Sequence, residues 1–406
     1  MDRAFLYCAC QVGAEAALKR EVVALDPTLR PAFARPGLVT FKLGEPGDLA
    51  DAQARAAAIT SGAVLARACG ASFGGVDAAQ PGALEAAFAT IREARPRGAA
   101  IRLQAWERDR WRPGEEPPGF AYGPAAAAAR ERLLAAWPAD LERLEGERAE
   151  VGEWVVDVIV GEPGEPWLLG AHVQRGGRVG AGGSPYPGAR VPVALEPAAP
   201  SRAYYKIEEA IVAAALPLRA GDVAVELGSA PGGASYALLR RGLDVHGVDP
   251  GAMDPIVLGY GDMEGRDAGR PAYTHHACTM GQVHREDLPR DLHWVIADVN
   301  LAPQIALQTV RRLAARPRSA LLGIVVTLKL DDWRALRHVP RWRRQIEAMG
   351  MVESGVKQLS SNRMELFSYG LTRAGVARRG ASADAPREGS PRARARRGGG
   401  PGRKAP

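Results

Sequence analysis

The chain has 406 residues, 46% of them hydrophobic, and a formal charge of +7. This length allows two domains with full cores, and because no run of 18 apolar residues occurs, no membrane span is expected. The amino terminus lacks the charged and apolar segments of a signal peptide, and the four cysteines show neither metal-ligand spacing nor a disulfide framework. These features predict a cytoplasmic protein.

The positive charge is concentrated at the carboxyl end of the chain. Residues 371–406 contain ten Lys and Arg against two acids, a charge of +8, so residues 1–370 carry −1. The segment 375–406 is rich in Gly, Pro and Arg and predicts a disordered basic tail. Such a tail is typical of a non-specific phosphate-binding arm, and equally of a merely solvated extension.

The first 175 residues predict an α+β region in which helices lie on a partly antiparallel sheet. Trp106 and Trp111 have arginines nearby and could stack on RNA, although a packed tryptophan is the commoner case. Residues 176–200 are Gly/Pro-rich and predict a linker. The expected strands are 4–9, 37–43, 100–105, 153–160 and 167–173, and the expected helices are 12–25, 48–58, 82–94 and 125–137.

Residues 223–249 predict a strand, a glycine-rich turn, a helix and a second strand that ends on Asp249. The turn has neither GxGxxG nor GxxxxGK[ST], so a dinucleotide is disfavoured and a P-loop is excluded. Asp249 follows Gly228 by 21 residues, a spacing typical of an acid that binds ribose hydroxyls. We therefore expect an adenosine-type ligand without phosphates, with a purely structural turn as the alternative.

Four charged residues are predicted to meet at one edge of this second sheet. In an open α/β sheet, ligands bind beyond the carboxyl ends of the strands. A strand running antiparallel to its neighbours places its first residue at that same edge. The four are Lys206, in a helix after Ser201; Asp298 and Lys329, at the ends of apolar strands 292–297 and 320–328; and Glu365, in the last strand, 364–371.

The region 201–370 resembles the FtsJ-like ribose 2′-O-methyltransferases, whose signature is an ordered Lys, Asp, Lys, Glu tetrad. Among these it is most similar to the bacterial large-subunit rRNA cytidine 2′-O-methyltransferase M family. Members of that family carry a THUMP-type RNA-binding region and then a linker ending in Pro-Ser-Arg, as at residues 200–202 here. The tetrad segments read SRAYYKIEEA, VIADVN, VVTLKL and NRMELFSYG.

The resemblance implies a Rossmann-like α/β methyltransferase sheet, mostly parallel with its last strand antiparallel, after an α+β THUMP-like region. It implies regions at 1–175, 176–200 (linker), 201–374 (methyltransferase) and 375–406 (tail). It also implies S-adenosylmethionine as cofactor, RNA and specifically large-subunit rRNA as partner, and no metal. The implied catalytic residues are Lys206, Asp298, Lys329 and Glu365, and the implied cofactor residues are Glu226, Gly228, Ser229, Pro231, Gly232, Gly233, Asp249 and Asp298.

In this interpretation Lys329 is the general base, and its pKa would fall through burial and the nearby Lys206. The sequence departs from the family at three points: Ala234 replaces a tryptophan, Glu226 replaces an aspartate, and residues 274–280 lack the acid expected to contact adenine. A degenerate RNA-binding or ribosome-assembly factor is the main alternative. An enzyme acting on small molecules and a base methyltransferase are further alternatives.

Two other groups of side chains have open interpretations. His275 and His276 are adjacent, and because consecutive strand residues face opposite sides, we expect one packed and one exposed histidine. A basic stretch near the proposed site could contact phosphate or form a solvated helix face. Its arginines are Arg334, Arg337, Arg341, Arg343 and Arg344.

Overall fold

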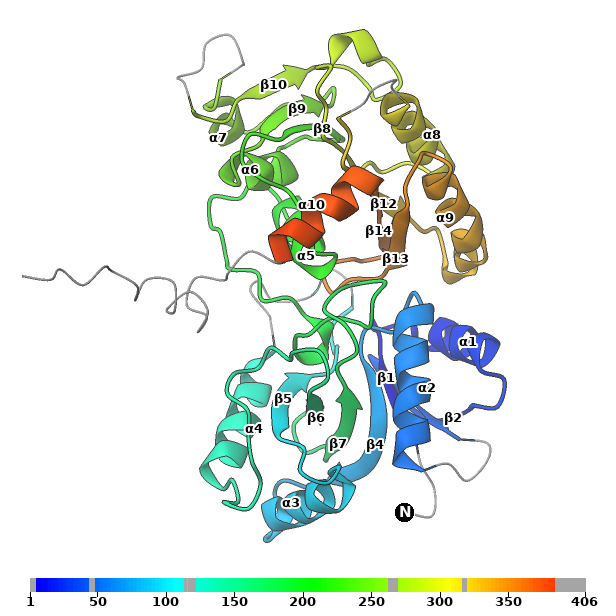
Figure 1. Cartoon of the computed structure of the whole chain (residues 1–406), viewed down its shortest axis with the longest axis vertical. Helices are drawn as coiled ribbons and strands as arrows, with labels where there is room; N and C mark the ends of the chain where they lie inside the picture. Colours follow the sequence, from blue (N-terminus) through cyan, green and yellow to red (C-terminus); the bar gives the residue numbers. More distant parts are fainter. Residues whose placement is uncertain are drawn as a thin grey trace, which may run out of the picture.

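The computed structural model describes residues 5–43, 48–112, 115, 122–261, 269–315 and 320–383. It contains two seven-stranded sheets, β1 to β7 and β8 to β14. In Figure 1 the first sheet occupies the lower half of the molecule and the second the upper half. The sequence also predicts a loop at 111–124 and a loop-rich insert at 251–270; parts of both, and the tail beyond Ala383, lie outside the described residues.

The first sheet has the order β2-β3-β1-β4-β7-β6-β5 and is antiparallel except between β5 and β6. Because side chains alternate along a strand, Leu6 and Cys8 face the helices, whereas Tyr7 faces the opposite side. The strands are Phe5–Ala9, Arg30–Arg35, Leu38–Lys42, Cys69–Val76, Ile101–Glu107, Trp154–Val160 and Trp167–Val173. The helices α1 to α4 are Glu15–Leu25, Leu49–Gly62, Ala83–Ala94 and Pro124–Ala135.

Two strands of this sheet were not expected from the sequence. β2 is an edge strand whose residues are almost all exposed, so it shows no alternation of apolar and polar residues. β4 contains Gly70, Gly74 and Gly75, which are unfavourable in strands. A bulge between Ser72 and Gly74 accommodates part of that irregularity.

The second sheet has the order β10-β9-β8-β11-β12-β14-β13. Strands β8 to β12 pair in parallel, whereas β14 is antiparallel to both β12 and β13. The strands β8 to β14 are Val223–Leu227, Asp244–Val248, Tyr273–His276, Trp294–Ala297, Gly323–Lys329, Glu353–Lys357 and Glu365–Leu371. The last strand is therefore antiparallel to both neighbours, as expected, and an α/β architecture with a mixed sheet is present.

Helices cover both faces of the second sheet. The core on one face includes residues of α5 to α7, with Val376 of α10 packed against it, and the core on the other includes residues of α8 and α9. The crossover helices thus change side between β8 and β11, and in open α/β sheets ligands bind at the carboxyl ends of the strands at such a point. The helices α5 to α10 are Ala203–Ala213, Gly233–Arg240, Pro255–Leu258, Pro303–Ala314, Val339–Glu347 and Arg373–Ala383.

Helix α10 corrects the expectation that the chain is disordered from residue 375. Arg378 donates to both carboxylate oxygens of Asp222, at 2.6 and 2.7 Å, and Arg379 pairs with Glu353. These ion pairs fix a helix whose Gly, Ala and Arg composition resembles that of a solvated tail. The second half of the fold therefore extends past residue 374.

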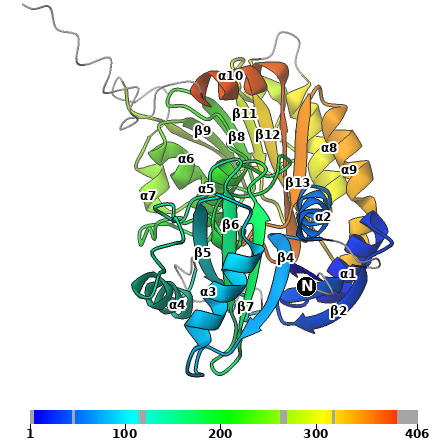
Figure 2. The ribbon, with the colours of Figure 1, turned by 60° about the horizontal axis from the view of Figure 1, so that its bottom comes forward.

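The two sheets meet where β13 lies beside α2, as Figure 2 shows. Lys357 of β13 is buried and donates to the carbonyl oxygens of Thr60 and Ala63, both at 2.8 Å. Apolar residues of both halves also belong to one continuous core, which includes Val64 and Val356. The two halves are thus held together by packing as well as by hydrogen bonds.

Candidate active site

The four predicted catalytic residues converge at the carboxyl edge of the second sheet. The amine of Lys206 lies 3.4 Å from Asp298 Oδ2 and 2.6 Å from Glu365 Oε1. The amine of Lys329 lies 3.0 Å from Asp298 Oδ1 and 2.5 Å from Glu365 Oε2. Two amines and two carboxylates therefore alternate around a closed ring of ion pairs.

Each member comes from a different element. Asp298 follows β11, and Lys329 ends β12 beside it. Glu365 begins β14 and is the direct cross-strand partner of Lys329, because β14 runs antiparallel to β12. Lys206 comes from the first turn of α5. The predicted meeting of four distant residues is thus found in the structure.

The electrostatics of the ring differ from the expectation for Lys329. Burial lowers the pKa of this amine, but the facing carboxylates of Asp298 and Glu365 outweigh burial and hold the pKa above its ordinary value. Burial also raises the pKa of Asp298, yet Lys206 and Lys329 hold it below its ordinary value. The sequence interpretation counted the second lysine and omitted the closer acids, so its predicted direction for Lys329 was wrong.

The glycine-rich turn connects β8 to α6 next to this ring. Gly228 has φ +81°, and a Cβ there would lie 2.6 Å from the carbonyl oxygen of Asp298. Gly232 has φ +119°, and a Cβ there would lie 2.6 Å from a methyl group of Val257. Both positions require glycine, because other residues are strained at these dihedral angles and would also collide with these neighbours.

Several predicted cofactor residues have inward-facing side chains. Glu226 is 1% exposed and accepts a hydrogen bond from Ser235, and burial raises its pKa to about 8. The hydroxyl of Ser229 is also buried and lies 3.3 Å from that of Tyr273. The buried side chains of Glu226 and Ser229 thus support the conformation of the turn from inside the protein. The roles of Ser235 and Tyr273 were not predicted, because neither belongs to a recognisable motif.

Other residues of the turn are placed to contact a ligand. Asp249 is partly exposed after β9, and its Oδ1 accepts the amide of Gly251 at 2.7 Å. Pro231 is exposed, whereas Gly232 and Gly233 are buried at the start of α6. The turn contains no lysine or arginine that would pair with a phosphate, while carboxylates stand at the ends of β9 and β11. This set of groups fits a phosphate-free adenosine that carries a positive charge.

The histidines do not divide into one packed and one exposed residue. His275 and His276 are both partly buried. One ring nitrogen of His275 lies 2.9 Å from the carbonyl oxygen of Asp249, while His276 lies 3.1 Å from the buried ring of His246. Among the residues that the structure describes, no group of three His, Cys, Asp or Glu is arranged to hold a metal ion.

The basic stretch follows Lys329 as a 3₁₀ helix, Trp333–His338, which leads directly into α9. The change from 3₁₀ to α-helix falls at Val339, just before Pro340. Arg334 is highly exposed and pairs with Asp332.

Trp106 is buried and donates to Asp157 at 2.9 Å, so it is packed, whereas Trp111 is 42% exposed. None of the described helices has the length and apolarity needed to cross a membrane.

Comparison with known families agrees with this geometry. Residues 199–322 match the family model described as FtsJ-like methyltransferase. The matched segment contains Lys206, the glycine-rich turn, Asp249 and Asp298. The resemblance inferred from the sequence is therefore confirmed for this segment.

Curated relatives named "Ribosomal RNA large subunit methyltransferase M" give more detail. The chain is 32% identical to the protein of Chromohalobacter salexigens over 139 residues, which cover 32% of this chain and 35% of the relative. It is 34% identical to the protein of Methylococcus capsulatus over 168 residues, which cover 40% of this chain and 44% of the relative. The chain thus spans less than half the length of these relatives.

Among solved structures, TrmN from Thermus thermophilus aligns with 91% of this chain and 99% of its own, at 16% identity and a TM-score of 0.31. A likeness at this level carries no argument about function.

Proposed function

We propose that this protein transfers a methyl group from S-adenosylmethionine to a ribose 2′-hydroxyl of RNA, with a cytidine of large-subunit rRNA as the target. The observation that carries the proposal is the closed ring of Lys206, Asp298, Lys329 and Glu365 beside a phosphate-free turn. The names of the matched relatives support rRNA as the substrate. No metal is required, because the proposed chemistry needs only a base and a held methyl donor.

In this mechanism Lys329 takes the proton of the 2′-hydroxyl as the ribose oxygen attacks the methyl group. The bound cofactor supplies an electrophilic methyl group on a positively charged sulfur. Asp298 orients Lys329, and Glu365 holds Lys206 in place. The amine of Lys329 accepts a proton only when it is neutral. Any positive charge bound near Asp298 would lower the pKa of Lys329 and so increase the fraction of neutral amine.

The cofactor is proposed to lie over the glycine-rich turn. Asp249 would accept the ribose hydroxyls of the cofactor, and Asp298 would face its positive charge. The backbone from Gly228 to Gly233, with Ser229 and Pro231, would form the floor, and Glu226 would support that floor from below. Residues 1–175 are proposed to be the THUMP-like region that binds RNA, joined by the linker 176–200.

The direct test is methyl transfer from labelled cofactor to rRNA that lacks the modification, followed by identification of the methylated nucleoside. The expected product is 2′-O-methylcytidine, and a substrate with 2′-deoxycytidine at the target should accept no label. Methylation of a base, or equal labelling of the deoxy substrate, would overturn the proposal. An RNA-binding protein without catalysis would bind the rRNA and leave it unlabelled.

A further inference from the structure

Helix α5 carries a second charged residue with a specific function in the fold. Glu209 lies one turn after Lys206 and is 2% exposed. Its Oε1 accepts hydrogen bonds from the amide of Ser360 at 3.0 Å and from the hydroxyl of Ser360 at 2.5 Å. Its Oε2 accepts the amide of Ser361 at 2.8 Å. The carboxylate thus joins α5 to another part of the chain.

The segment bound by Glu209 is the 358–363 loop, which joins β13 to β14. Inside this loop the amide of Leu359 donates to the side chain of Asn362 at 2.9 Å, which closes a tight turn. Glu365 of the tetrad follows two residues after the loop. Glu209 therefore connects the helix that carries Lys206 with the loop that places Glu365.

The energetics favour a precise connection. Removing a carboxylate from water costs several kcal/mol, and well-formed hydrogen bonds offset that cost only in good geometry. Three hydrogen bonds of 3.0, 2.5 and 2.8 Å to one side chain meet this condition and leave α5 little freedom to slide along the loop. At the other end of the same connection, the amine of Lys206 lies 2.6 Å from Glu365 Oε1.

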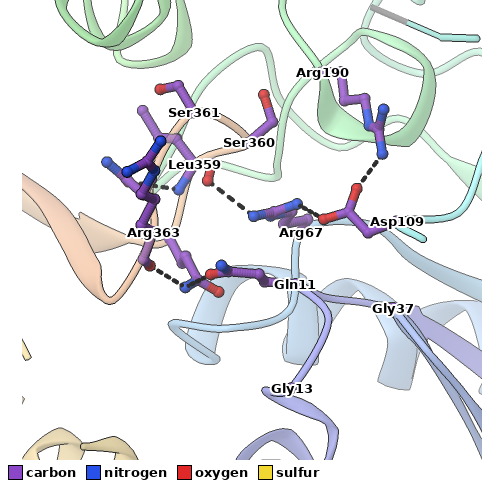
Figure 3. Close-up of polar contacts among 12 residues, drawn as sticks. Gln11, Gly13, Gly37, Arg67, Asp109, Arg190, Leu359, Ser360, Ser361 and Arg363 are labelled. Atoms are coloured by element: carbon purple, nitrogen blue, oxygen red, sulfur yellow. Dashed lines mark hydrogen bonds and ion pairs between the residues drawn. The ribbon is translucent and has the colours of Figure 1, made fainter. Parts of the chain in front are cut away.

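The opposite side of the 358–363 loop is held by the first half of the protein (Figure 3). Arg67 donates to the carbonyl oxygen of Leu359 at 3.1 Å, and the amide of Gln358 donates to Val64 at 3.0 Å. The side chain of Gln358 also donates to Gln11. Figure 3 shows Arg67 between Leu359 and Asp109, which pairs with it. One loop thus contacts the first sheet region, α5 and the start of β14.

We propose that Glu209 is a positioning residue that keeps Lys206 aligned with Glu365 through the 358–363 loop. Because the first half of the protein also forms hydrogen bonds to the 358–363 loop, its packing against the second half also sets the alignment of Lys206 with Glu365. The proposal rests on the proposed methyl transfer for its catalytic consequence. The mechanical connection itself can be tested without that reaction.

The principal variant is Glu209→Gln, which keeps the shape but places an NH₂ group against amide donors. Misplacement by a fraction of an ångström should lower kcat by about 10- to 100-fold while KM for cofactor and RNA changes little. The pH profile should also shift to higher pH. Asp298 and Glu365 face Lys329, and Lys206 pairs with the same two carboxylates. If Lys206 moves away, the negative charge of Glu365 is less neutralised. That charge then raises the pKa of Lys329, so the amine is harder to deprotonate.

Asp222→Asn is the matched control. Asp222 is a buried carboxylate at the opposite edge of the same sheet, and it accepts hydrogen bonds from Trp294, Arg378 and the amide of Arg219. Its replacement should lower stability comparably and leave kcat and the pH profile of folded protein unchanged. If both variants keep wild-type kcat and pH profiles, Glu209 has no positioning role.

Hydrogen exchange separates this proposal from the proposed function. In Glu209→Gln the amides of Ser360 and Ser361 should exchange faster, together with those of α5, and in Asp222→Asn they should not. Faster exchange in a protein whose wild type methylates no RNA would refute the proposed function and leave the connection intact. Unchanged exchange at these amides would refute the connection even in an active enzyme.

Discussion

Each of the two sheets of this protein holds a cluster of polar side chains. The two clusters differ in their position within the sheet and in how exposed they are. In the first sheet, Asp157 lies in the middle of β6, is 1% exposed and accepts from Tyr7, Trp106 and His172 at 2.5, 2.9 and 2.7 Å. In the second sheet, the tetrad lies where the strands end, and its amines are about one-fifth exposed. A fully hydrogen-bonded cluster within a sheet face stabilises the fold, whereas the charges gathered at these strand ends remain partly exposed to solvent.

The largest expected effect distinguishes these two roles directly. Lys329→Ala removes the proposed base and should lower methyl transfer by about 10³-fold, within the range for general-base catalysis. The measurement is single-turnover transfer of labelled methyl to rRNA, with circular dichroism to show that the variant is folded. A variant with near-wild-type turnover would assign proton removal to another group.

The counterpart in the first sheet is Asp157→Ala. Its three donors would lose their acceptor inside the protein, so the free energy of unfolding should fall by about 4 kcal/mol. Urea unfolding measures this loss, and methyl transfer per folded molecule should change less than twofold. A large loss of kcat in correctly folded protein would mean that the Asp157 cluster takes part in the reaction.

Glu226 tests the floor of the proposed cofactor site. Its folded pKa of about 8 exceeds that of the unfolded chain, so the folded state binds more protons between pH 5 and 8 and becomes less stable as pH rises. Glu226→Gln removes this penalty, so the variant should gain about 1 kcal/mol over wild type for each pH unit in this range. Parallel pH–stability curves for the two proteins would contradict the buried, protonated state.

The last prediction concerns the pH dependence of the reaction. Because the two carboxylates hold the pKa of Lys329 above its ordinary value, the neutral amine is rare at pH 7 and its population rises with pH. Methyl transfer in the chemical step should therefore increase about tenfold per pH unit from pH 6 to 8. A rate that is flat over this range, measured in single turnovers, would contradict a raised pKa of Lys329 in the reacting complex.

The sequence predicted the second half better than the first, for physical reasons. Asp298 and Lys329 end uninterrupted apolar strands, so their common edge follows from parallel pairing alone. The Asp157 cluster joins strands that lie far apart in the chain, and nothing local to β6 indicates its partners. Glu209 looks like a surface residue of a helix until the 358–363 loop is placed over it. Predicting whether the pKa of Lys329 is raised or lowered requires its distances to both carboxylates, and the spacing of residues in the sequence does not provide them.

The order of strands also determines when the protein can become active during its synthesis. β14 is made after β13 but lies between β13 and β12, and it alone supplies Glu365. A nascent chain that ends before this strand has the glycine-rich turn and both lysines but lacks Glu365, one member of the ring. The proposed reaction therefore requires the last strand of the sheet, so truncated translation products would carry the proposed cofactor turn without the complete ring.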